Sequence, residues 1–573
     1  MTVQEDALMK LYALTDFPDD ALDGFTPKQM DEFNRIFSEY GVSRMYFQYY
    51  GNRDYGWCMN CDLPEREGNK KTAELMPNYS RVFVEAAKKY GMEACAVMRP
   101  QEQGLWMVTS PHINQGRTPG IPHIGGEMLG YATFTKEHPG LRIKRRGWDI
   151  DPDSVDKTVG MLKLYKQNDL PMRFGKDEIT IYVSDDNADY QPYEGNFSVI
   201  ETTEAAVETV YLSKANPYAS EVLTEAGAPI RVMTISGLSI EHRYIAVGVR
   251  CSSSDMPENR FINVPLHAIA CFDVDGNKIC ATPGGTRIGT LTREPFLTAG
   301  FNFDDGFGAY MVTSLDPDED EGYYAIAKGK NEYVHGALCE CEPAVKEYWL
   351  SLLEQALEDG YDWFGNRIEC HSVHVDEPFA YGYNDCIKEE YFRRYGECCE
   401  EEMELSKIAK IRGDAYTELF VEAARRVRAR GRKVYLTLNV EMLHDPIPLD
   451  RLYAYPMNVE WQWERWLELI QPDEINFRLY MASLDFLLED PQCQHMIEVA
   501  KNYGVPMTVE RYPSEQFAKE FERLRDTGLF DAMIMYETAS YLKTDGTTAM
   551  KLTELGKTVL PQLKTLLQEG SAE

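Results

Sequence analysis

The chain has 573 residues, 44% of them hydrophobic, which is enough apolar surface for a packed core and argues against global disorder. Its formal net charge is −34, and a field of that sign repels nucleic-acid backbones and anionic lipids. The amino terminus lacks the basic flank, apolar run and cleavage site of a signal peptide, and no segment reaches the roughly 18 apolar residues of a membrane span. We therefore expect a cytoplasmic protein that binds neither nucleic acid nor membrane.

The cysteines point to a reducing compartment. There are 13 of them, an odd number scattered along the chain, which is typical of reduced thiols and not of a disulfide framework. Cys58 and Cys61 form the only Cys-x-x-Cys pair, and neither a second pair nor histidines at ligand spacing follow it. We expect no metal and no cofactor.

Two helix and strand units open the chain. Residues 27–40, PKQMDEFNRIFSEY, have the apolar spacing of a helix, Gly41 ends it, and the β-rich run VSRMYFQYY follows. The same order returns in YSRVFVEAAKKYG, which ends at Gly91, and in MEACAVMRP. Helix, glycine and strand in repetition are typical of parallel α/β units.

The pattern changes after about residue 173. Short alternating runs separated by turn residues appear, among them EITIYVSDD, APIRVMTIS and EHRYIAVGVR. HAIACFDVDGNKICA is typical of a hairpin with Asp275 and Gly276 at its turn. No long helical segment interrupts this region through about residue 315, and α/β order resumes afterwards, so we expect an inserted all-β, sandwich-like domain.

Five further helix and strand units follow, from PAVKEYWLSLLEQALEDG with WFGNRIECHS to FAKEFERLRDTG with LFDAMIMYETA. Together with the first two units the count is seven, one fewer than the eight units of a (β/α)8 TIM barrel. We expect the missing unit to be the third and to lie near the insertion. An open doubly wound sheet is the alternative, but no Gly-x-Gly-x-x-Gly turn follows any strand. The predicted parts are 1–172 for the first part of the barrel, 173–325 for the inserted domain and 326–573 for the rest of the barrel.

Four of the expected barrel strands carry polar or charged side chains at every second position. Alternate residues of a barrel strand face the interior, and the last interior positions form the floor of the active site. The expected inward rows are Arg367, Glu369 and His371; Tyr435, Thr437, Asn439 and Glu441; Asn476, Arg478 and Tyr480; and Thr508, Glu510 and Tyr512. The alternative is that these charges form a structural ion-pair network. A purely structural network gives no reason for the charges to lie at the catalytic end of the barrel, so we favour a functional site.

Glycoside hydrolysis requires one protonated carboxylic acid and a second carboxylate as nucleophile or base. Glu377, just past one strand, and Glu510, at the end of a strand three units later, are the predicted catalytic pair. Glu369 and Glu537 are the reserves, and an ordinary solvated or salt-bridged glutamate is the alternative for each. The residues predicted to bind substrate are Arg367, His371, His374, Asp376, Asn439, Glu441, Arg478, Tyr480, Tyr50 and Trp57.

Histidines and aromatic rings accompany these carboxylates. His371 and His374 with Asp376 suggest a metal, but positions three apart on an extended strand face opposite sides, so hydrogen bonding is the preferred role. Aromatic rings, which stack on the apolar faces of sugars, cluster at the same strand ends. They are Tyr49, Tyr50, Tyr55, Trp57, Tyr381, Tyr383, Trp461, Trp463 and Trp466. For the three tryptophans Trp461, Trp463 and Trp466, packing of a helix against the core is the alternative.

The carboxyl-terminal half resembles the family 10-like glycosyl hydrolases, (β/α)8 proteins found mainly in bacteria. The resemblance rests on EPAVKEYWLSLLEQALEDGYDWFGNRIECHS, DEPFAYGYNDCIKEEYFRRYG and VEWQWERWLELIQPDEINFR, with a fainter match in GVSRMYFQYYG and HPGLRIKRR. It covers more than half of the chain and leaves out the β-rich insertion. It implies a glycosidase-like barrel with substrate at the carboxyl ends of the strands.

Asp376-Glu377-Pro378 is also similar to the Asn-Glu-Pro triplet of the larger clan of retaining glycosidases, whose acid/base glutamate follows strand four and whose nucleophile ends strand seven. This likeness implies Glu377 as acid/base and Glu510, on the expected seventh strand, as nucleophile. Asp replaces the Asn that is associated with the sugar 2-hydroxyl. If the triplet belongs to a longer loop, Glu369 is the acid instead.

We therefore expect a glycoside hydrolase that acts on an oligosaccharide or small glycoside by two-carboxylate chemistry with retention. A sugar lyase or isomerase with His371 as base and a non-catalytic carbohydrate-binding protein are the alternatives. The insertion is expected to cap the cleft, to bind glycan or to form an interface in a homo-oligomer, and the sequence leaves these three open.

Overall fold

Eight parallel strands close into a barrel in the computed structural model, which confirms the predicted (β/α)8 fold class. The structure describes residues 9–17, 24–49, 67–101, 103, 132–149, 152–172, 174–185, 190–211, 222–250, 266–281, 312–313, 321–330, 332–368, 378–396, 399–445, 458–479, 482–544 and 549–570. The barrel strands in order are β1 (Lys10–Thr15), β2 (Val42–Tyr49), β3 (Glu93–Met98), β18 (Trp363–Asn366), β19 (Lys433–Asn439), β20 (Glu474–Arg478), β21 (Met507–Arg511) and β22 (Ala532–Met535).

The strand missing from the sequence count is β1, so its placement near the insertion was wrong. Tyr12 pairs with Arg44 of β2 on one side and with Ile534 of β22 on the other, which closes the barrel. Every residue of KLYALT after the lysine is buried, because a parallel barrel strand is covered on both faces. Such a strand shows no alternation of apolar and polar residues.

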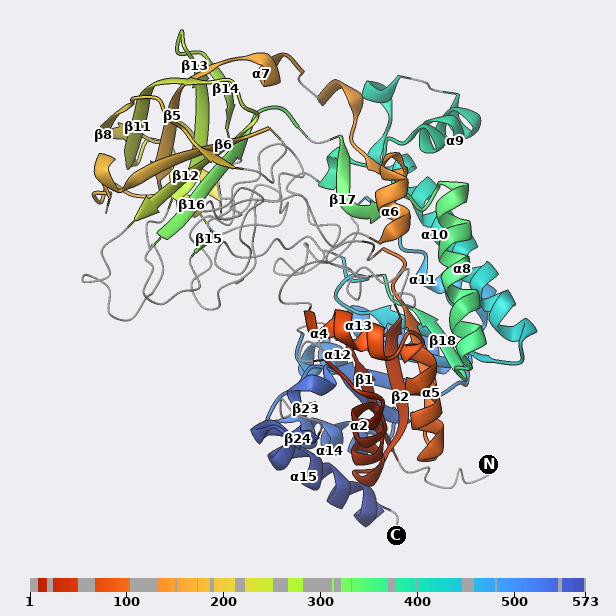
Figure 1. Cartoon of the computed structure of the whole chain (residues 1–573). Coiled ribbons are helices and arrows are strands. Elements are labelled where there is room, and N and C mark those ends of the chain that lie inside the picture. The colour runs from red at the N-terminus through yellow and green to blue at the C-terminus, as the bar shows by residue number, and fades with distance from the viewer. Residues whose placement is uncertain are drawn as a thin grey trace.

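Helices surround the barrel (Figure 1), and the outward side chains of the strands pack against them in one large apolar core. The sequence begins α2 with a capping box, in which Thr26 and Gln29 satisfy each other's backbone groups. The helices are α2 (Pro27–Glu39), α4 (Glu67–Leu75), α5 (Tyr79–Lys89), α6 (Thr133–Glu137), α7 (Pro152–Asp156), α8 (Pro343–Asp359), α9 (Asp385–Tyr395), α10 (Leu405–Ala429), α11 (Trp463–Ile470), α12 (Leu484–Glu489), α13 (Pro491–Lys501), α14 (Phe517–Thr527) and α15 (Glu554–Gly570).

Two five-stranded antiparallel sheets lie apart from the barrel, at the upper left of Figure 1. One has the order β14 (Lys278–Ala281), β13 (Leu266–Asp273), β5 (Val159–Lys166), β11 (Pro229–Ile240) and β8 (Ser198–Ala205). The other has the order β15 (Val312–Thr313), β16 (Glu321–Ala327), β12 (Tyr244–Arg250), β6 (Ile179–Ser184) and β7 (Gln191–Pro192). Two-stranded sheets join β9 (Val210–Tyr211) to β10 (Val222–Thr224), β4 (Arg142–Lys144) to β17 (Tyr333–Leu338), and β23 (Leu542–Thr544) to β24 (Met550–Leu552).

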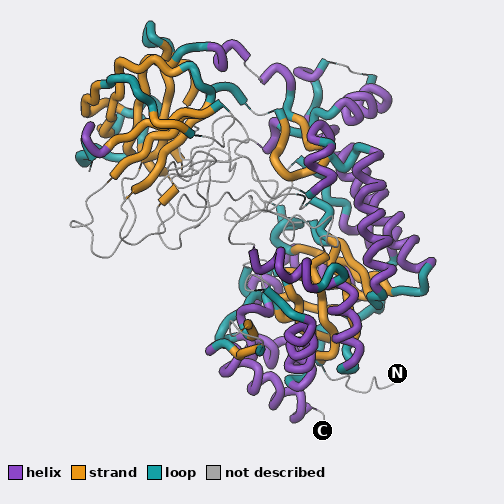
Figure 2. The backbone as a smooth tube through the Cα atoms, in the orientation of Figure 1, coloured by secondary structure: helices purple, strands orange, loops and turns teal. Residues whose placement is uncertain are grey.

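The two five-stranded sheets share one apolar core. Leu164 of β5 and Ile235 of β11 lie in the same buried cluster as Val247 of β12 and Ile326 of β16. The strands of this region contrast with the helix-rich barrel in Figure 2, and we propose that its two sheets form the expected sandwich. Because β5 precedes the expected boundary at residue 173, we propose that the inserted domain begins before β5.

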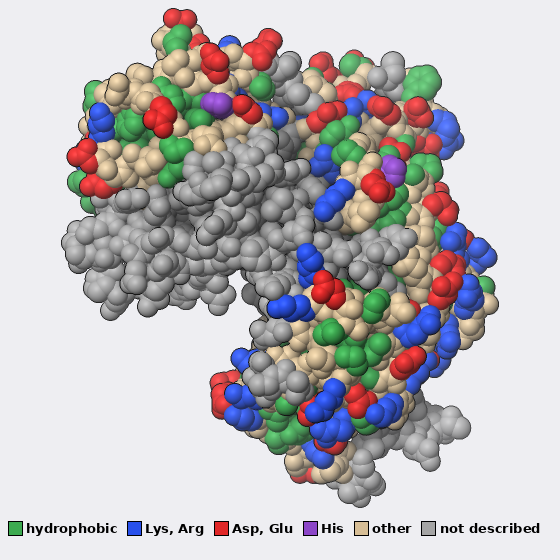
Figure 3. Space-filling view, in the orientation of Figure 1, with side chains coloured by type: hydrophobic (Ala, Val, Ile, Leu, Met, Phe, Trp, Pro, Cys, Tyr) green, Lys and Arg blue, Asp and Glu red, His purple; other side chains and the backbone are tan. Residues whose placement is uncertain are grey.

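A buried ion pair occupies the barrel interior near the amino ends of the strands. Nη1 of Arg44 donates to Oε2 of Glu474 at 2.6 Å, and the exposed fractions of these two side chains are 4% and 1%. The Arg44 guanidinium lies between the rings of Tyr12 and Trp363, 4.3 and 4.0 Å from their centroids. Part of the charge inside the barrel is therefore structural. On the face drawn in Figure 3, acidic and basic side chains are interspersed over the barrel helices.

Candidate active site

Charged and polar side chains from many strands meet at the carboxyl end of the barrel. The inward row of each strand continues to this end, so residues far apart in sequence gather there. They are Asp16 after β1, Gln48 on β2, Arg99 after β3, Arg367 after β18, Arg478 on β20, Glu510 on β21, and Tyr536 after β22. Each has an exposed fraction of 6% or less.

Glu510 lies between two arginines. Nη1 of Arg478 donates to Oε1 of Glu510, and Nη1 of Arg367 lies 3.7 Å from the same oxygen. Nδ2 of Asn476 donates to Oε2 at 3.4 Å. Burial raises the pKa of the Glu510 carboxyl above its ordinary value, although Arg367, Asn476 and Arg99 act in the opposite direction. The carboxylate is therefore held in one orientation by cationic and amide donors.

Tyr536 connects this group to a second carboxylate. The guanidinium carbons of Arg367 and Arg478 each lie 4.7 Å from the centroid of its ring. Its hydroxyl donates to Oδ2 of Asp16 at 3.4 Å, and Nε2 of Gln48 donates to the same oxygen at 2.7 Å. Two carboxylates thus share one network at the catalytic end of the barrel.

Asp16, Gln48 and Arg99 were missed in the sequence. Arg99 donates to Oε1 of Gln48 at 2.9 Å and lies 3.7 Å from Oδ2 of Asp16. Asp16 follows the strand that was not recognised. The alternation Arg44, Tyr46, Gln48 in the second strand is the signal that could have identified Gln48.

The structure brings three of the predicted site residues together: Arg367, Arg478 and Glu510. Glu510 is on β21, the seventh strand of the barrel order, as predicted. Glu537 follows β22 with φ 52, in the left-handed region that a glutamate adopts only with strain. Its catalytic role stays a prediction.

Two other predicted substrate-binding residues anchor loops at this end of the barrel. Oε1 of Glu441, which is 1% exposed, accepts a hydrogen bond from the backbone N–H of Ala482 at 2.8 Å. Oδ1 of Asn439 accepts one from the backbone N–H of Met442 at 3.2 Å. These contacts hold the chain after β19 and after β20, and the roles of Asn439 and Glu441 in substrate binding stay predictions.

Several predicted residues lie outside the described part of the chain. They are Tyr50, Tyr55, Trp57, Glu369, His371, His374, Asp376, Glu377 and Tyr480.

Four of the aromatic residues expected in a carbohydrate cleft are buried in apolar clusters, among them Tyr49, which is 1% exposed. Trp466 has no exposed surface, and its Nε1 donates to Oγ1 of Thr417 at 2.8 Å. Tyr381 and Tyr383 are each 2% exposed and belong to a separate apolar cluster near α9. For Trp466 the alternative of helix packing is confirmed, while a role of Tyr381 and Tyr383 in a cleft stays a prediction.

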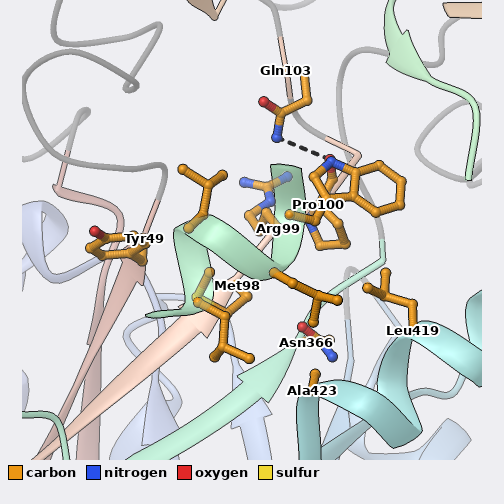
Figure 4. A pocket seen from close by; sticks show the side chains of 12 residues that line it. Tyr49, Met98, Arg99, Pro100, Gln103, Asn366, Leu419 and Ala423 are labelled. Carbon is orange, nitrogen blue, oxygen red and sulfur yellow. Dashed lines mark hydrogen bonds between the residues drawn. The ribbon is translucent and has the colours of Figure 1, made fainter. Parts of the chain in front are cut away.

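A mostly apolar pocket adjoins the site at Arg99 (Figure 4). It lies between the ends of β2, β3 and β18 and the helices α8 and α10. Nε2 of Gln103 donates to the backbone oxygen of Pro100 at 3.0 Å along its rim. The indole N–H of Trp349, which also lines the pocket, is buried without a hydrogen-bond partner among the described residues.

No group of three or more His, Cys, Asp or Glu side chains in the described residues is arranged to hold a metal ion. Within the same described ranges, every helix is too short or too polar to cross a membrane.

No family model matches the chain, and no curated protein matches it. Among solved structures it is similar to a GH128 (subgroup III) curdlan-specific exo-beta-1,3-glucanase from Blastomyces gilchristii, with 14% identity, a TM-score of 0.22, and coverage of 39% of this chain and 78% of that chain. It is also similar to the glycoside hydrolase domain of PelA from Pseudomonas aeruginosa, with 13% identity, a TM-score of 0.19, and coverage of 38% and 68%. A third similar structure is an isomaltulose synthase from Klebsiella sp. LX3, with 9% identity, a TM-score of 0.32, and coverage of 99% and 70%. At these values the fold is established by the strand pairing of this chain and not by the likenesses.

Proposed function

We propose that the chain is a glycoside hydrolase that cleaves an oligosaccharide or a small glycoside, with Glu510 as nucleophile and Glu377 as general acid/base. The observation that carries the proposal is the place of Glu510, buried at the carboxyl end of the seventh barrel strand between Arg367 and Arg478. This end of the barrel is where TIM-barrel enzymes bind and convert their substrates.

The surroundings of Glu510 suit a nucleophile. Arg367 opposes the rise in the pKa of Glu510 that burial causes, and Arg478 and Arg367 together fix the direction of its oxygens. An ionised, oriented carboxylate can attack the anomeric carbon while Glu377 protonates the leaving oxygen. Glu377 then removes a proton from the water that releases the sugar from Glu510. Arg367 and Arg478 therefore act as positioning residues for the nucleophile in addition to their expected contact with substrate.

Aryl glycosides of different sugars provide the test. We expect Glu377→Gln to lower kcat/KM by about 10²–10⁴ on substrates with poor leaving groups, since it removes general acid catalysis. Glu510→Gln leaves Arg478 and Arg367 without their carboxylate, which should cost about 3–5 kcal/mol, and it should abolish turnover at a temperature at which circular dichroism shows the variant to be folded. NMR of the first product of the wild-type chain should show a retained anomeric configuration. Glu520→Gln is the control, because Glu520 lies on helix α14 and pairs with Arg511 at 2.9 Å.

Other outcomes would contradict the proposal. Unaltered turnover in Glu510→Gln would remove its chemical basis. Loss of wild-type activity on adding a chelator would favour a metal-dependent lyase or isomerase. Calorimetric binding of glycans without any turnover would favour a carbohydrate-binding protein. Loss of activity in Asp16→Asn but not in Glu377→Gln would make Asp16 the second carboxylate.

A further inference from the structure

A hollow of about 340 Å³ lies between α10 and the start of α11. It is lined by Lys410 of α10 and by residues 460–465, which include the first residues of α11. Its volume falls within the range of about 300–1,000 Å³ that small-molecule sites occupy. None of the residues that line it belongs to the cluster around Glu510, so the two sites share no side chain.

Two tryptophans of this hollow keep part of their surface exposed. Trp461 and Trp463 are half-buried, while Trp466 in the same segment is fully buried and takes the core position. The centroid of the Trp461 ring lies 5.3 Å from that of Tyr416 and 6.2 Å from that of Trp466, which fixes its orientation. The Trp463 ring lies 6.1 Å from the ring of His495. Fixed aromatic rings with exposed surface can stack on the apolar face of a sugar.

The polar side chains around the tryptophans are held in place by their neighbours. Oε1 of Gln462 accepts a hydrogen bond from Oγ1 of Thr417 at 2.9 Å. Nε2 of Gln462 donates to Oδ1 of Asp414 and to Oε2 of Glu460, each at 2.9 Å. Nη1 of Arg465 donates to the same Asp414 oxygen at 2.8 Å. Because these side chains are already ordered, less conformational entropy is lost when a ligand binds.

Other polar atoms of the hollow remain available to a ligand. Among the described residues, no hydrogen bond engages Nε or Nη2 of Arg465, Oε1 of Glu460, or the indole N–H groups of Trp461 and Trp463. The exposed fractions of the Arg465 and Glu460 side chains are 50% and 49%. A hydroxyl group both donates and accepts, so the hydroxyls of a sugar can use these donors and this acceptor together.

The charges that line the hollow balance. Lys410 and Arg465 are the two cations, and Glu460 and Glu464 are the two carboxylates. Nζ of Lys410 lies 3.5 Å from Oε2 of Glu460. A balanced lining gives no net attraction to a phosphate-bearing or a strongly cationic ligand. It suits a neutral ligand that combines many hydroxyls with an apolar face.

The hollow lies toward the carboxyl end of the barrel. Tyr416, whose ring contacts Trp461, accepts a hydrogen bond at its hydroxyl from Nε2 of Gln101. Gln101 follows the carboxyl end of β3 and stands two residues after Arg99 of the catalytic cluster. One tyrosine therefore separates the hollow from the strand ends.

We propose that this hollow is a second carbohydrate-binding site. Sugar units of a neutral oligosaccharide stack on Trp461 and Trp463 there and hydrogen-bond to Arg465 and Glu460. The choice of a glycan as ligand rests on the proposed function, but the site binds the glycan and does not cleave it.

The test uses the full chain labelled with 5-fluorotryptophan and followed by fluorine NMR, in which the 8 tryptophans give separate signals. Trp461→Phe, Trp463→Phe and Trp148→Ala assign three of these signals by their disappearance. The probes are laminarihexaose, cellohexaose and maltohexaose, three neutral hexasaccharides. With at least one of them, we expect the Trp461 and Trp463 signals to shift to saturation while the Trp148 signal stays in place.

Two variants and a control complete the experiment. Trp463→Ala removes a stacking surface and Arg465→Met removes hydrogen-bond donors, so each should raise the dissociation constant measured at the Trp461 signal several-fold. Arg465 is half exposed, so this variant provides the test even where Trp463→Ala lowers stability. Trp148→Ala is the matched control, because Trp148 is 43% exposed and does not line the hollow. Its dissociation constant should equal that of the wild type.

Two results would overturn the site. One is the absence of a shift at Trp461 and Trp463 with all three hexasaccharides. The other is an equal dissociation constant in the wild type, Trp463→Ala and Arg465→Met. Turnover of aryl glycosides is a separate measurement: its absence would end the hydrolase proposal, whereas saturable shifts at Trp461 and Trp463 would still establish the binding site.

Discussion

Removing the Arg44 guanidinium from the barrel interior should destabilise the protein strongly. In Arg44→Met the Glu474 carboxylate, 1% exposed, loses the cation that donates to it at 2.6 Å. Breaking a buried pair from one side costs about 3–5 kcal/mol, because a charge is left without compensation. The cation–π contacts with Tyr12 and Trp363 are lost as well and add to the effect.

Urea unfolding followed by tryptophan fluorescence measures the loss, and Trp363 is a reporter next to the substitution. Arg35→Met is the matched control. Arg35 pairs with Glu39 at 2.5 Å, but the exposed fractions of the two side chains are 39% and 57%. Exposed pairs contribute about 0–1 kcal/mol, so the control should unfold at nearly the wild-type urea concentration.

The dependence on pH has a defined sign. Burial raises the pKa of Glu474 above its ordinary value of 4.5, and the positive charge of Arg44 acts in the opposite direction. Removing that charge in Arg44→Met therefore raises the pKa of Glu474 further. A folded state that binds the proton more tightly than the unfolded state loses stability as the pH rises. The destabilisation by Arg44→Met should therefore be smaller near pH 5 than near pH 8. A loss no larger than that of Arg35→Met, or one independent of pH, would refute the reasoning.

Two further variants test local packing and loop anchoring. A Cβ at Gly413 would overlap the backbone oxygen of Glu460, so Gly413→Ala should cost about 1–3 kcal/mol by overpacking in the same urea assay. Gly431→Ala is its control: nothing lies within 4 Å of a Cβ there, and only its φ of 67° adds a penalty of about 1 kcal/mol. Glu441→Gln weakens the hydrogen bond from the Ala482 N–H and should cost about 1 kcal/mol. Unchanged amide exchange at Ala482 in this variant would contradict its anchoring role.

The barrel was predictable because its helices and glycines follow strong rules. Gly41 and Gly91 adopt φ values of 92° and 77° at the ends of α2 and α5, a conformation that glycine allows at little cost. β1 was not predictable in the same way. Its inward Tyr12 and Leu14 and its outward Leu11 are all buried, so the sequence carries no period of two.

The site was predictable only in part, because alternation gives the face of a strand and not the depth along it. Glu474 and Arg478 stand in the same inward row of β20. The first lies in the structural pair with Arg44, while the second contacts Glu510 at the catalytic end. Strand register against the neighbours decides between these two roles, and register is a property of the assembled barrel.

The pairing of β3 with β18 has a consequence for folding. Met98 and Asn366 are partners across these strands, although the whole β-rich region lies between them in the chain. Each doubling of a connecting segment costs only about 0.6 kcal/mol in closure entropy, so three doublings beyond an ordinary crossover cost about 2 kcal/mol. The long segment between β3 and β18 therefore costs little free energy in the folded state, but it determines the order in which the barrel strands can pair. The first three strands leave the ribosome long before their later neighbours exist, so both outer edges of this sheet stay unpaired, that of β3 until β18 is made and that of β1 until β22 is made.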